Sequence, residues 1–218
     1  MRTGILGGTF NPIHLAHLRI AEEVRESCTL DRVLFIPAAT PPHKEVAEAV
    51  PFAHRLAMVQ AAIAGNAAFA VSDLEARREG KSYSVHTLEI LQQENPQDEL
   101  FFIIGMDSFR DLHLWKDYQR LFELANLVVA ARPGVEVGDP QELLPVAIRG
   151  EFCYDKPLEK LLHRSGRSVV FLEERLLGIS STGIRRLLAE GRSIRYLVPS
   201  AVEQYLITHA LYRGAERA

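Results

Sequence analysis

The sequence predicts an α/β protein with a doubly wound, mainly parallel sheet, helices on both faces and a helical C-terminal part. Its 218 residues are 47% hydrophobic and 24% charged, the ordinary balance of one globular domain with a sizeable core. Short β-branched and aromatic runs alternate with longer runs of helical periodicity, which is typical of βαβ units. Several short runs are apolar throughout, as strands buried on both faces of a parallel sheet are. Such an arrangement is Rossmann-like.

Six segments have the composition of strands. Between them, three longer segments place apolar residues on one helical face, and the second of these begins with proline, which suits a first helical turn. The predicted strands are residues 3–6, 33–36, 69–72, 100–104, 127–131 and 169–172, and the predicted helices are residues 15–26, 51–64 and 84–93.

The last third of the chain is less regular. Residues 134–167 are rich in glycine and proline, so we expect a connection there with one or two short helices. Residues 180–212 are predicted to be helical, with a break at Leu197-Val198-Pro199. We therefore expect a single domain over residues 1–218, in which residues 1–178 form the α/β core and residues 179–218 the helical part.

Charge and cysteine content exclude several classes of protein. Lys and Arg number 25 against 28 Asp and Glu, so a basic face for sequence-blind nucleic-acid binding is not expected. Cys28 and Cys153 are in no Cys-x-x-Cys pair and are expected to be reduced thiols. A strand-like run directly follows the first residues, which argues against a signal peptide, and the longest uncharged stretch is too short and polar for a bilayer. A cytoplasmic protein with no membrane partner is the expectation.

The first predicted strand ends at Gly7-Gly8-Thr9-Phe10. In open α/β sheets, ligands bind beyond the carboxyl ends of the strands, near the topological switch point. A glycine turn at this place would let backbone N–H groups approach a phosphate. The spacing matches neither the dinucleotide fingerprint nor a Walker loop, so the glycines alone are a weak signal.

Two histidines, His14 and His17, follow the glycines at the start of the first predicted helix. Their spacing puts both imidazoles on one helical face. An imidazole there can donate hydrogen bonds to phosphoryl oxygens and stabilise charge that builds up in a transition state. A single histidine would more often cap a helix or fill a core, but this pair favours a functional role. A metal site is the competing interpretation, and no third ligand is placed nearby.

Residues 179–186, Ile-Ser-Ser-Thr-Gly-Ile-Arg-Arg, are the second strong feature. The hydroxyl residues are typical helix caps. Arg185 and Arg186 fall in or near the first turn, where the helix dipole disfavours cations. A bound anion would resolve that conflict, so a second phosphate site is predicted at Ser180, Ser181, Thr182 and Arg185. The alternative is a solvated helix start that tolerates its arginines, because each misplaced charge costs under about 1 kcal/mol.

Gly105-Met106-Asp107 is the third feature, directly after an apolar strand. An acidic side chain at a strand's carboxyl end often accepts hydrogen bonds from ribose hydroxyls, although Asp107 could equally cap a helix. Two phosphate sites that face an acidic ribose acceptor suggest a nucleotide substrate. The missing Walker lysine favours cleavage at the α-phosphate rather than at the γ-phosphate.

At this point the sequence resembles a known family. Residues 7–18 are similar to the N-terminal signature of the nucleotidyltransferase superfamily, and residues 179–185 to its C-terminal Ser-Ser-Thr-x-Ile-Arg signature. Further motifs narrow the resemblance to the bacterial nicotinate-mononucleotide adenylyltransferases, and it spans nearly the whole chain. These motifs are Pro41-Pro42-His43-Lys44, Ser82-Tyr83-Ser84-Val85, residues 102–109 with Trp115, Tyr196-Leu197-Val198-Pro199 and the ending Leu211-Tyr212.

The resemblance implies that ATP and nicotinate mononucleotide give nicotinate adenine dinucleotide and pyrophosphate by in-line attack on the α-phosphorus, without a covalent enzyme intermediate. Mg²⁺ would then arrive with ATP, held by phosphates and water rather than by a protein metal site. The catalytic residues implied are His14, His17 and Arg185, of which His17 would steady charge on the α-phosphate. The ATP-binding residues implied are Gly7, Gly8, Thr9, Phe10, Lys44, Gly105, Asp107, Ile179, Ser180, Thr182 and Arg185.

For the acceptor, the resemblance implies a pocket in which an indole stacks on the pyridine ring and backbone N–H groups receive the nicotinate carboxylate. The residues implied are Tyr83, Ser84, Val85, Trp115 and Arg132. Three positions depart from the family pattern: Ala16 replaces a glycine, Asn11 replaces the commoner aspartate, and His86 replaces a frequent aspartate.

Several alternatives stay open at this stage. A phosphopantetheine adenylyltransferase or a cytidylyltransferase would use the same core, but the length and the Trp115 motif count against both. An enzyme that accepts the amide mononucleotide in place of the nicotinate form is harder to exclude from the sequence. A non-catalytic nucleotide-binding regulator is disfavoured by the intact histidines and arginine, and a hydride-transferring enzyme by the missing fingerprint. Assembly into a homo-oligomer is left open.

Overall fold

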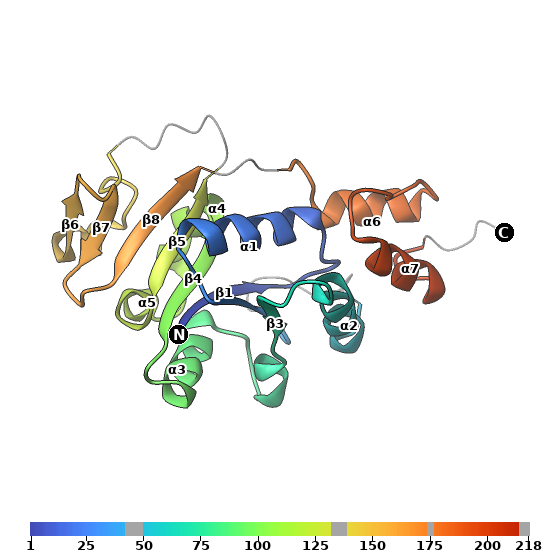
Figure 1. Cartoon of the computed structure of the whole chain (residues 1–218), viewed down its shortest axis with the longest axis horizontal. Helices are drawn as coiled ribbons and strands as arrows, with labels where there is room; N and C mark the ends of the chain where they lie inside the picture. Colours follow the sequence, from blue (N-terminus) through green and yellow to red (C-terminus); the bar gives the residue numbers. More distant parts are fainter. Residues whose placement is uncertain (42–49, 132–138, 174–176, 214–218) are drawn as a thin grey trace.

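The structure is a computed structural model that describes residues 1–41, 50–131, 139–173 and 177–213. Its centre is an eight-stranded sheet in the order β3-β2-β1-β4-β5-β8-β7-β6 (Figure 1). All six predicted strands are present within a few residues of the expected ends. The strands are β1 (Arg2–Gly8), β2 (Arg32–Pro37), β3 (Phe69–Val71), β4 (Glu99–Gly105), β5 (Asn126–Ala131), β6 (Phe152–Asp155), β7 (Lys160–His163) and β8 (Ser168–Glu173).

The strands from β3 to β8 in this order pair in parallel, which confirms the predicted doubly wound sheet. Strand β1 lies between β2 and β4, with Leu6 opposite Phe35 on one side and Ile103 on the other. The chain leaves β1 in one direction and returns on the other side of it at β4, so the topological switch point lies at the carboxyl ends of β1 and β4.

Helices cover both faces of the sheet. The predicted helices are confirmed, except that Pro51 precedes its helix as the cap, and the break before Pro199 divides the C-terminal part into two helices. The α-helices are α1 (Leu15–Ser27), α2 (Phe52–Ile63), α3 (Ser84–Glu94), α4 (Met106–Arg110), α5 (Tyr118–Leu124), α6 (Ser181–Ala189) and α7 (Ser200–Thr208), and the 3-10 helices are η1 (Leu74–Arg77), η2 (Leu112–Leu114) and η3 (Val146–Glu151).

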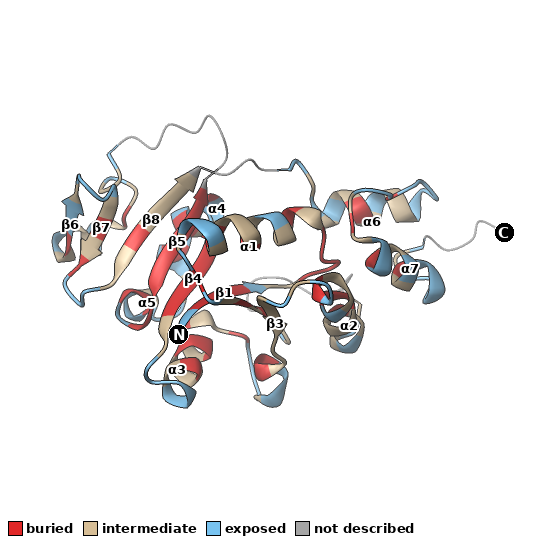
Figure 2. Ribbon diagram, in the orientation of Figure 1, coloured by how far each residue is buried: buried red, intermediate tan, exposed pale blue. Residues whose placement is uncertain are grey.

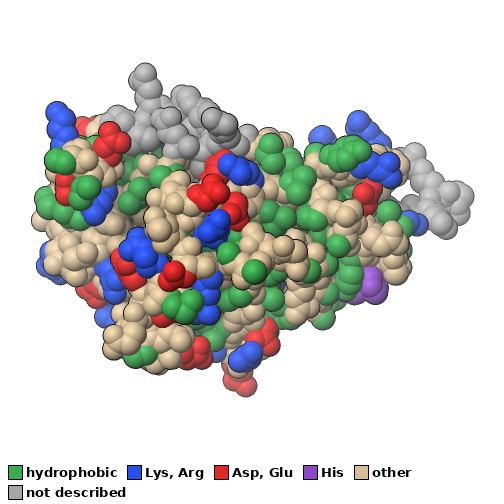
Figure 3. Space-filling view, in the orientation of Figure 1, with side chains coloured by type: hydrophobic (Ala, Val, Ile, Leu, Met, Phe, Trp, Pro, Cys, Tyr) green, Lys and Arg blue, Asp and Glu red, His purple; other side chains and the backbone are tan. Residues whose placement is uncertain are grey.

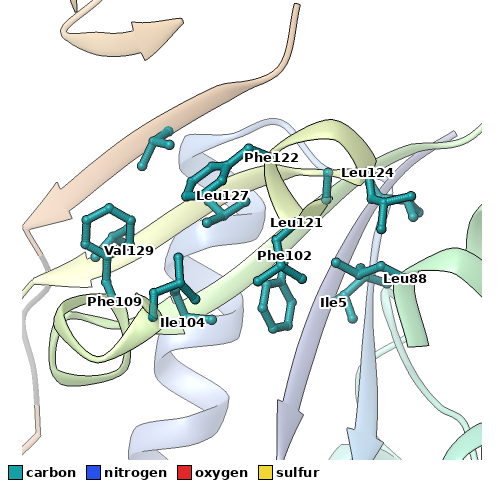
Figure 4. Close-up of a cluster of buried hydrophobic side chains, with 14 of the residues drawn as sticks. Ile5, Leu88, Phe102, Ile104, Phe109, Leu121, Phe122, Leu124, Leu127 and Val129 are labelled. Carbon is teal, nitrogen blue, oxygen red and sulfur yellow. The ribbon is translucent and has the colours of Figure 1, made fainter. Parts of the chain in front are cut away.

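The core consists of two clusters of buried side chains, one on each face of the sheet. Alternate residues of β4 divide between them: Phe102 and Ile104 belong to the first cluster, Phe101 and Ile103 to the second. Side chains of α3, α4 and α5 complete the first cluster (Figure 4), and those of α1, α2, α6 and α7 complete the second. Figure 2 shows burial concentrated on β4 and β5. The C-terminal helices therefore share a core with β1 and β2.

The prediction for residues 134–167 was wrong in part. The described residues of this segment contain η3 as expected, but also the antiparallel hairpin β6–β7, which joins the sheet through β8. Each strand is only four residues long and buries few side chains, Leu161 and His163 in β7 among them. Because glycine and proline flank these short strands, the weak alternation of buried and exposed residues along them was not recognised in the sequence.

In Figure 3, Lys and Arg side chains gather around α6 on the face in view. Cys28 and Cys153 are both free thiols. Across the four described ranges, no helix has the length and apolar character to cross a bilayer.

Candidate active site

A cavity of about 360 Å³ opens at the switch point, a typical size and place for a small-molecule site. Its walls come from the carboxyl ends of β1 and β4, the segment after β2, helix α1 and the start of α3. Nine residues that the sequence implicated meet in it: Gly7, Gly8, Thr9, His17, Tyr83, Ser84, Val85, Gly105 and Trp115.

The two glycines differ from the prediction of a glycine turn, because both are the last residues of β1. The turn follows after them, and Phe10 has a positive φ of 47°. A Cβ at Gly8 would lie 3.3 Å from the Phe10 ring, while a Cβ at Gly7 would meet nothing within 4 Å. The absent side chains thus leave open space at Gly7 for a ligand and room at Gly8 for the phenylalanine.

His14 and His17 form a stacked pair at the start of α1. Their ring centroids are 3.7 Å apart with an interplanar angle of 24°. The His14 backbone N–H donates to His17 Nδ1 across 3.3 Å. Because Nδ1 accepts a hydrogen bond, the neutral His17 ring carries its hydrogen on Nε2. His17 lines the cavity, so this N–H is available as a donor to a bound anion.

Burial favours the neutral form of both imidazoles. Burial lowers the pKa of His14 from 6.5 to about 4. Burial, with a smaller contribution from His14, lowers the pKa of His17 to about 3. His14 Nδ1 is buried without a hydrogen-bond partner in the described part of the chain. A negatively charged ligand beside the pair would raise both pKa values and favour the protonated forms.

Phe10, expected among the ATP-binding residues, is buried behind His17. Its ring meets that of His17 edge-on at 5.1 Å and that of Phe35 at 6.0 Å. The side chain is 2% exposed. Phe10 therefore packs behind the imidazole and holds its orientation.

Arg55 of α2 was missed by the sequence reasoning. It is 2% exposed, and its guanidinium donates to four backbone carbonyls: Thr9 at 2.8 Å, Ala38 at 2.7 Å, Val50 at 3.3 Å and Ala39 at 3.4 Å. Burial lowers its pKa, and no carboxylate of the described residues forms an ion pair with it. Arg55 ties the segment after β1 to the segment after β2, and so fixes one rim of the cavity.

The amino end of α6 docks on the loop that leads from β1 to the histidines. Ser180 is the N-cap, as predicted, and its hydroxyl accepts from the Gly183 N–H at 3.1 Å. The Ser181 hydroxyl donates to the Pro12 carbonyl at 2.9 Å, and Arg185 Nη1 donates to the Asn11 carbonyl at 2.9 Å. The two predicted phosphate motifs, separated by about 170 residues in the chain, are thus joined directly.

Thr182 and Tyr212 make further hydrogen bonds at this helix end. Arg185 Nη2 lies 3.4 Å from the Thr182 hydroxyl. The Tyr212 hydroxyl donates to the Asn11 side chain, and burial raises the pKa of this tyrosine. Ser180 and Thr182 are exposed beside the half-buried Ile179 and Arg185, so the helix end presents hydroxyl groups and a guanidinium to solvent.

At the β4 end, Gly105 rather than Asp107 is the N-cap of α4. Asp107 lies in the first turn and is exposed. The cap interpretation of Asp107 is therefore wrong. Asp107 follows the cavity-lining Gly105 by two residues and is not itself part of the cavity lining among the described residues.

The acceptor wall opposite the histidines is built by the start of α3 and by Trp115. Trp115 is half-buried and packs against Phe102 with ring centroids 6.3 Å apart, so it serves the core and the cavity together. Ser84 and Val85 are the first two residues of α3, and their backbone N–H groups donate to no acceptor within the described ranges. Two other expected residues, Lys44 and Arg132, lie outside the described residues.

Comparisons with known proteins fit this arrangement. A family model described as cytidylyltransferase-like matches residues 5–187. A "probable nicotinate-nucleotide adenylyltransferase" of Syntrophotalea carbinolica is 68% identical over the whole length of both chains. The chain belongs to the nicotinate-nucleotide adenylyltransferase family. A second relative of that name, from Geobacter sulfurreducens, is 60% identical over 97% of this chain and 98% of its own.

The fold matches solved structures whose titles name nicotinate or nicotinic acid mononucleotide adenylyltransferases. The Plasmodium falciparum nicotinic acid mononucleotide adenylyltransferase complexed with NaAD matches with a TM-score of 0.74 and 17% identity, over 97% of each chain. A structure titled "The Crystal Structure of a Putative Nicotinate-nucleotide Adenylyltransferase from Vibrio parahaemolyticus" matches with a TM-score of 0.66 and 21% identity, over 99% of this chain and 98% of its own. At such identities the likeness concerns the fold, which confirms the predicted Rossmann-like class.

Proposed function

We propose that this chain transfers the adenylyl group of Mg-ATP to nicotinate mononucleotide, giving nicotinate adenine dinucleotide and pyrophosphate in NAD biosynthesis. The observation that carries the proposal is the shared cavity. It joins the His17 imidazole and the glycine end of β1 to the Tyr83–Val85 segment and Trp115. One cavity with an anion-binding side and an aromatic side suits two substrates that must meet at a phosphate. The family to which the chain belongs supports the same reaction.

The chemistry needs positioning rather than a covalent intermediate. An oxygen of the acceptor's phosphate forms a bond to the α-phosphorus of ATP, and the bond from that phosphorus to the bridging oxygen breaks. Pyrophosphate leaves with the bonding electron pair, so charge builds up on the leaving group. His17 Nε2–H donates to the α-phosphate region, and the helix end at Ser180, Thr182 and Arg185 holds the outer phosphates.

The metal ion belongs to the nucleotide substrate in this proposal. No group of three His, Cys, Asp or Glu side chains in the described ranges is arranged to hold a cation. Coordination by the triphosphate oxygens and water suits Mg²⁺, which keeps several waters when it binds. The proposed substrates are small and charged, and the proposed reaction needs neither nucleic acid nor a membrane as a partner.

The acceptor is placed by the aromatic wall. Trp115 offers an indole face to a pyridine ring, and the free N–H groups of Ser84 and Val85 face a carboxylate on that ring. Gly105 and Asp107 take the adenosine ribose of the second substrate. This division leaves the two reacting phosphates near His17.

Pyrophosphate release tests the proposal. The protein is mixed with Mg-ATP and, separately, nicotinate mononucleotide, nicotinamide mononucleotide or phosphopantetheine. We expect release with the nicotinate acceptor and a kcat/KM at least about tenfold lower with the amide, since a charged hydrogen-bonding partner is lost. Release only with phosphopantetheine would overturn the acceptor, and no release with any of the three would overturn the transferase.

A further inference from the structure

A lysine lines the acceptor side of the cavity. Lys116 directly follows Trp115, and both residues line the cavity. Its ammonium group lies 5.0 Å from the centre of the Tyr83 ring and 3.2 Å from His86 Nε2. The lysine is therefore drawn across the start of α3, where Tyr83 is the N-cap.

The His86 ring is itself oriented by a contact of its Nδ1 atom. Its Nδ1 lies 3.4 Å from one oxygen of Glu89, and Arg120 Nε donates to the other oxygen at 3.2 Å. With a hydrogen on Nδ1 toward Glu89 and none on Nε2, each imidazole nitrogen has a partner of the right kind, because Lys116 can only donate. The chain of contacts thus orients the imidazole so that it fixes the ammonium group.

The charge of Lys116 is not neutralised by a neighbouring acid. No carboxylate of the described residues lies within ion-pair distance of its ammonium group. Among the described residues that line the cavity, Lys116 is the only Lys or Arg and Glu75 the only Asp or Glu. These two side chains carry the charge of the cavity lining, and Arg55, outside that lining, also interacts electrostatically with Glu75.

Glu75 places a buried carboxylate in the wall of the cavity. It is 8% exposed, one carboxylate oxygen accepts from the Thr87 hydroxyl at 2.8 Å, and the other is buried without a partner in the described part of the chain. An anionic acceptor that entered beside this carboxylate would be repelled. A cation at the same end of the cavity offsets that repulsion, and the amino end of α3 adds to its effect.

We propose that Lys116 is the specificity-determining cation that favours an acceptor with a carboxylate on its pyridine ring over the neutral amide, and that His86 is the positioning residue that holds it over Tyr83. This inference rests on the proposed function. It also gives a role to His86, whose departure from the family pattern the sequence left without one. An imidazole that accepts a hydrogen bond from the ammonium group keeps it in place without cancelling its charge. A carboxylate at the same position would cancel that charge.

The test compares both acceptors in variants of Lys116. In Lys116→Met, which keeps the stem length, kcat/KM for nicotinate mononucleotide should fall about tenfold, the scale of one charge-assisted hydrogen bond, while that for the amide changes less than about twofold. Lys116→Arg should retain the preference. Lys156→Met, in the exposed turn between β6 and β7, removes a charge far from the cavity and is the matched control.

Each other result contradicts a stated part of the account. An equal fall for acid and amide would place Lys116 on the acceptor's phosphate and overturn the inference, as would no change for either acceptor. No pyrophosphate release by the unsubstituted protein with either acceptor would overturn the proposed function and the inference with it. Calorimetric titration of each folded variant with nicotinate mononucleotide gives the same comparison without turnover.

His86 is tested as a positioning residue. His86→Leu removes the acceptor of the Lys116 hydrogen bond, whereas His86→Gln retains a side-chain oxygen that can accept it. The leucine variant should raise KM for the acid with kcat nearly unchanged, and the glutamine variant should restore it. His86→Leu should add no further loss to Lys116→Met, because both act through one contact. Additive losses would show that His86 acts on its own and would overturn its assigned role.

Discussion

The His14 backbone N–H donates to Nδ1 of His17, and the two imidazoles stack 3.7 Å apart. One contact therefore sets both the orientation of the His17 ring and the nitrogen that carries its hydrogen. The remaining N–H faces the cavity at the end of β1. The proposed catalytic donor is thus held by the backbone of the other histidine of the pair.

Replacement of His17 tests the donor. In His17→Ala we expect kcat to fall roughly 10²-fold or more, the effect of removing one preorganised hydrogen-bond donor to transition-state charge. KM for the acceptor should change little, because the acceptor wall lies opposite. Steady-state kinetics measures both values. His209→Ala, on the exposed end of α7, is the control, and near-normal turnover in His17→Ala would make His17 a structural residue.

The histidine pair also makes stability depend on pH. Both folded-state pKa values, about 4 for His14 and about 3 for His17, lie below 6.5. At pH values between the folded-state pKa and 6.5, each histidine binds a proton in the unfolded chain but not in the folded chain. The contribution of the two histidines to stability is therefore fully present above pH 6.5 and is lost as the pH falls. The loss should be about 1.4 kcal/mol per pH unit for each histidine.

Urea unfolding between pH 6.5 and pH 4.5 measures this dependence. The comparison is with the double variant His14→Gln, His17→Gln, which shares every other titrating group. The free energy of unfolding of the unsubstituted protein should fall more steeply with decreasing pH. Parallel pH dependences of the two proteins would show that folding does not lower the pKa values of the pair.

Arg55 should be essential to stability. Arg55→Met leaves four backbone carbonyls without their donor, and we expect a loss of about 3 kcal/mol in the free energy of unfolding, reduced somewhat by relief of the buried charge. Arg19→Met, which breaks the exposed pair with Glu23, should cost less than about 1 kcal/mol. Chemical denaturation measures both. Equal losses would show that Arg55 does not brace the cavity rim.

The Ser180 cap should influence both stability and ATP affinity. Ser180→Ala removes the acceptor for the Gly183 N–H and should cost about 1 kcal/mol of stability. KM for ATP should rise, since the hydroxyls at this helix end are proposed to hold the outer phosphates. Ser200→Ala is the matched control, because the Ser200 side chain does not cap α7. An unchanged KM for ATP would remove Ser180 from the nucleotide site.

Much of this fold is predictable from the sequence because the parallel strands are buried on both faces. Phe101 to Ile104 read as an uninterrupted apolar run, and the alternation into two cores appears only in three dimensions. Strands β6 and β7 have no such run. Gly7 and Gly8 were expected in a turn, since glycine usually marks one, yet here they end a strand so that Phe10 and a ligand have room.

Within the site, motif residues were predictable and supporting residues were not. Arg55 lies three and four residues before the buried Met58 and Val59, a spacing that puts it on the inner face of α2 and could have identified it. Lys116 has no comparable local signal, because its environment depends on Tyr83 and His86 from a different element. Only the tertiary structure brings those groups together.

Transfer of the α-phosphate is the central claim, and isotopic labelling tests it most directly. The protein is incubated with nicotinate mononucleotide and Mg-ATP labelled at the α-phosphate, and the products are separated by chromatography. The label should enter nicotinate adenine dinucleotide, in a one-to-one ratio with unlabelled pyrophosphate. Label that remains in ADP or AMP, with no dinucleotide formed, would contradict the account.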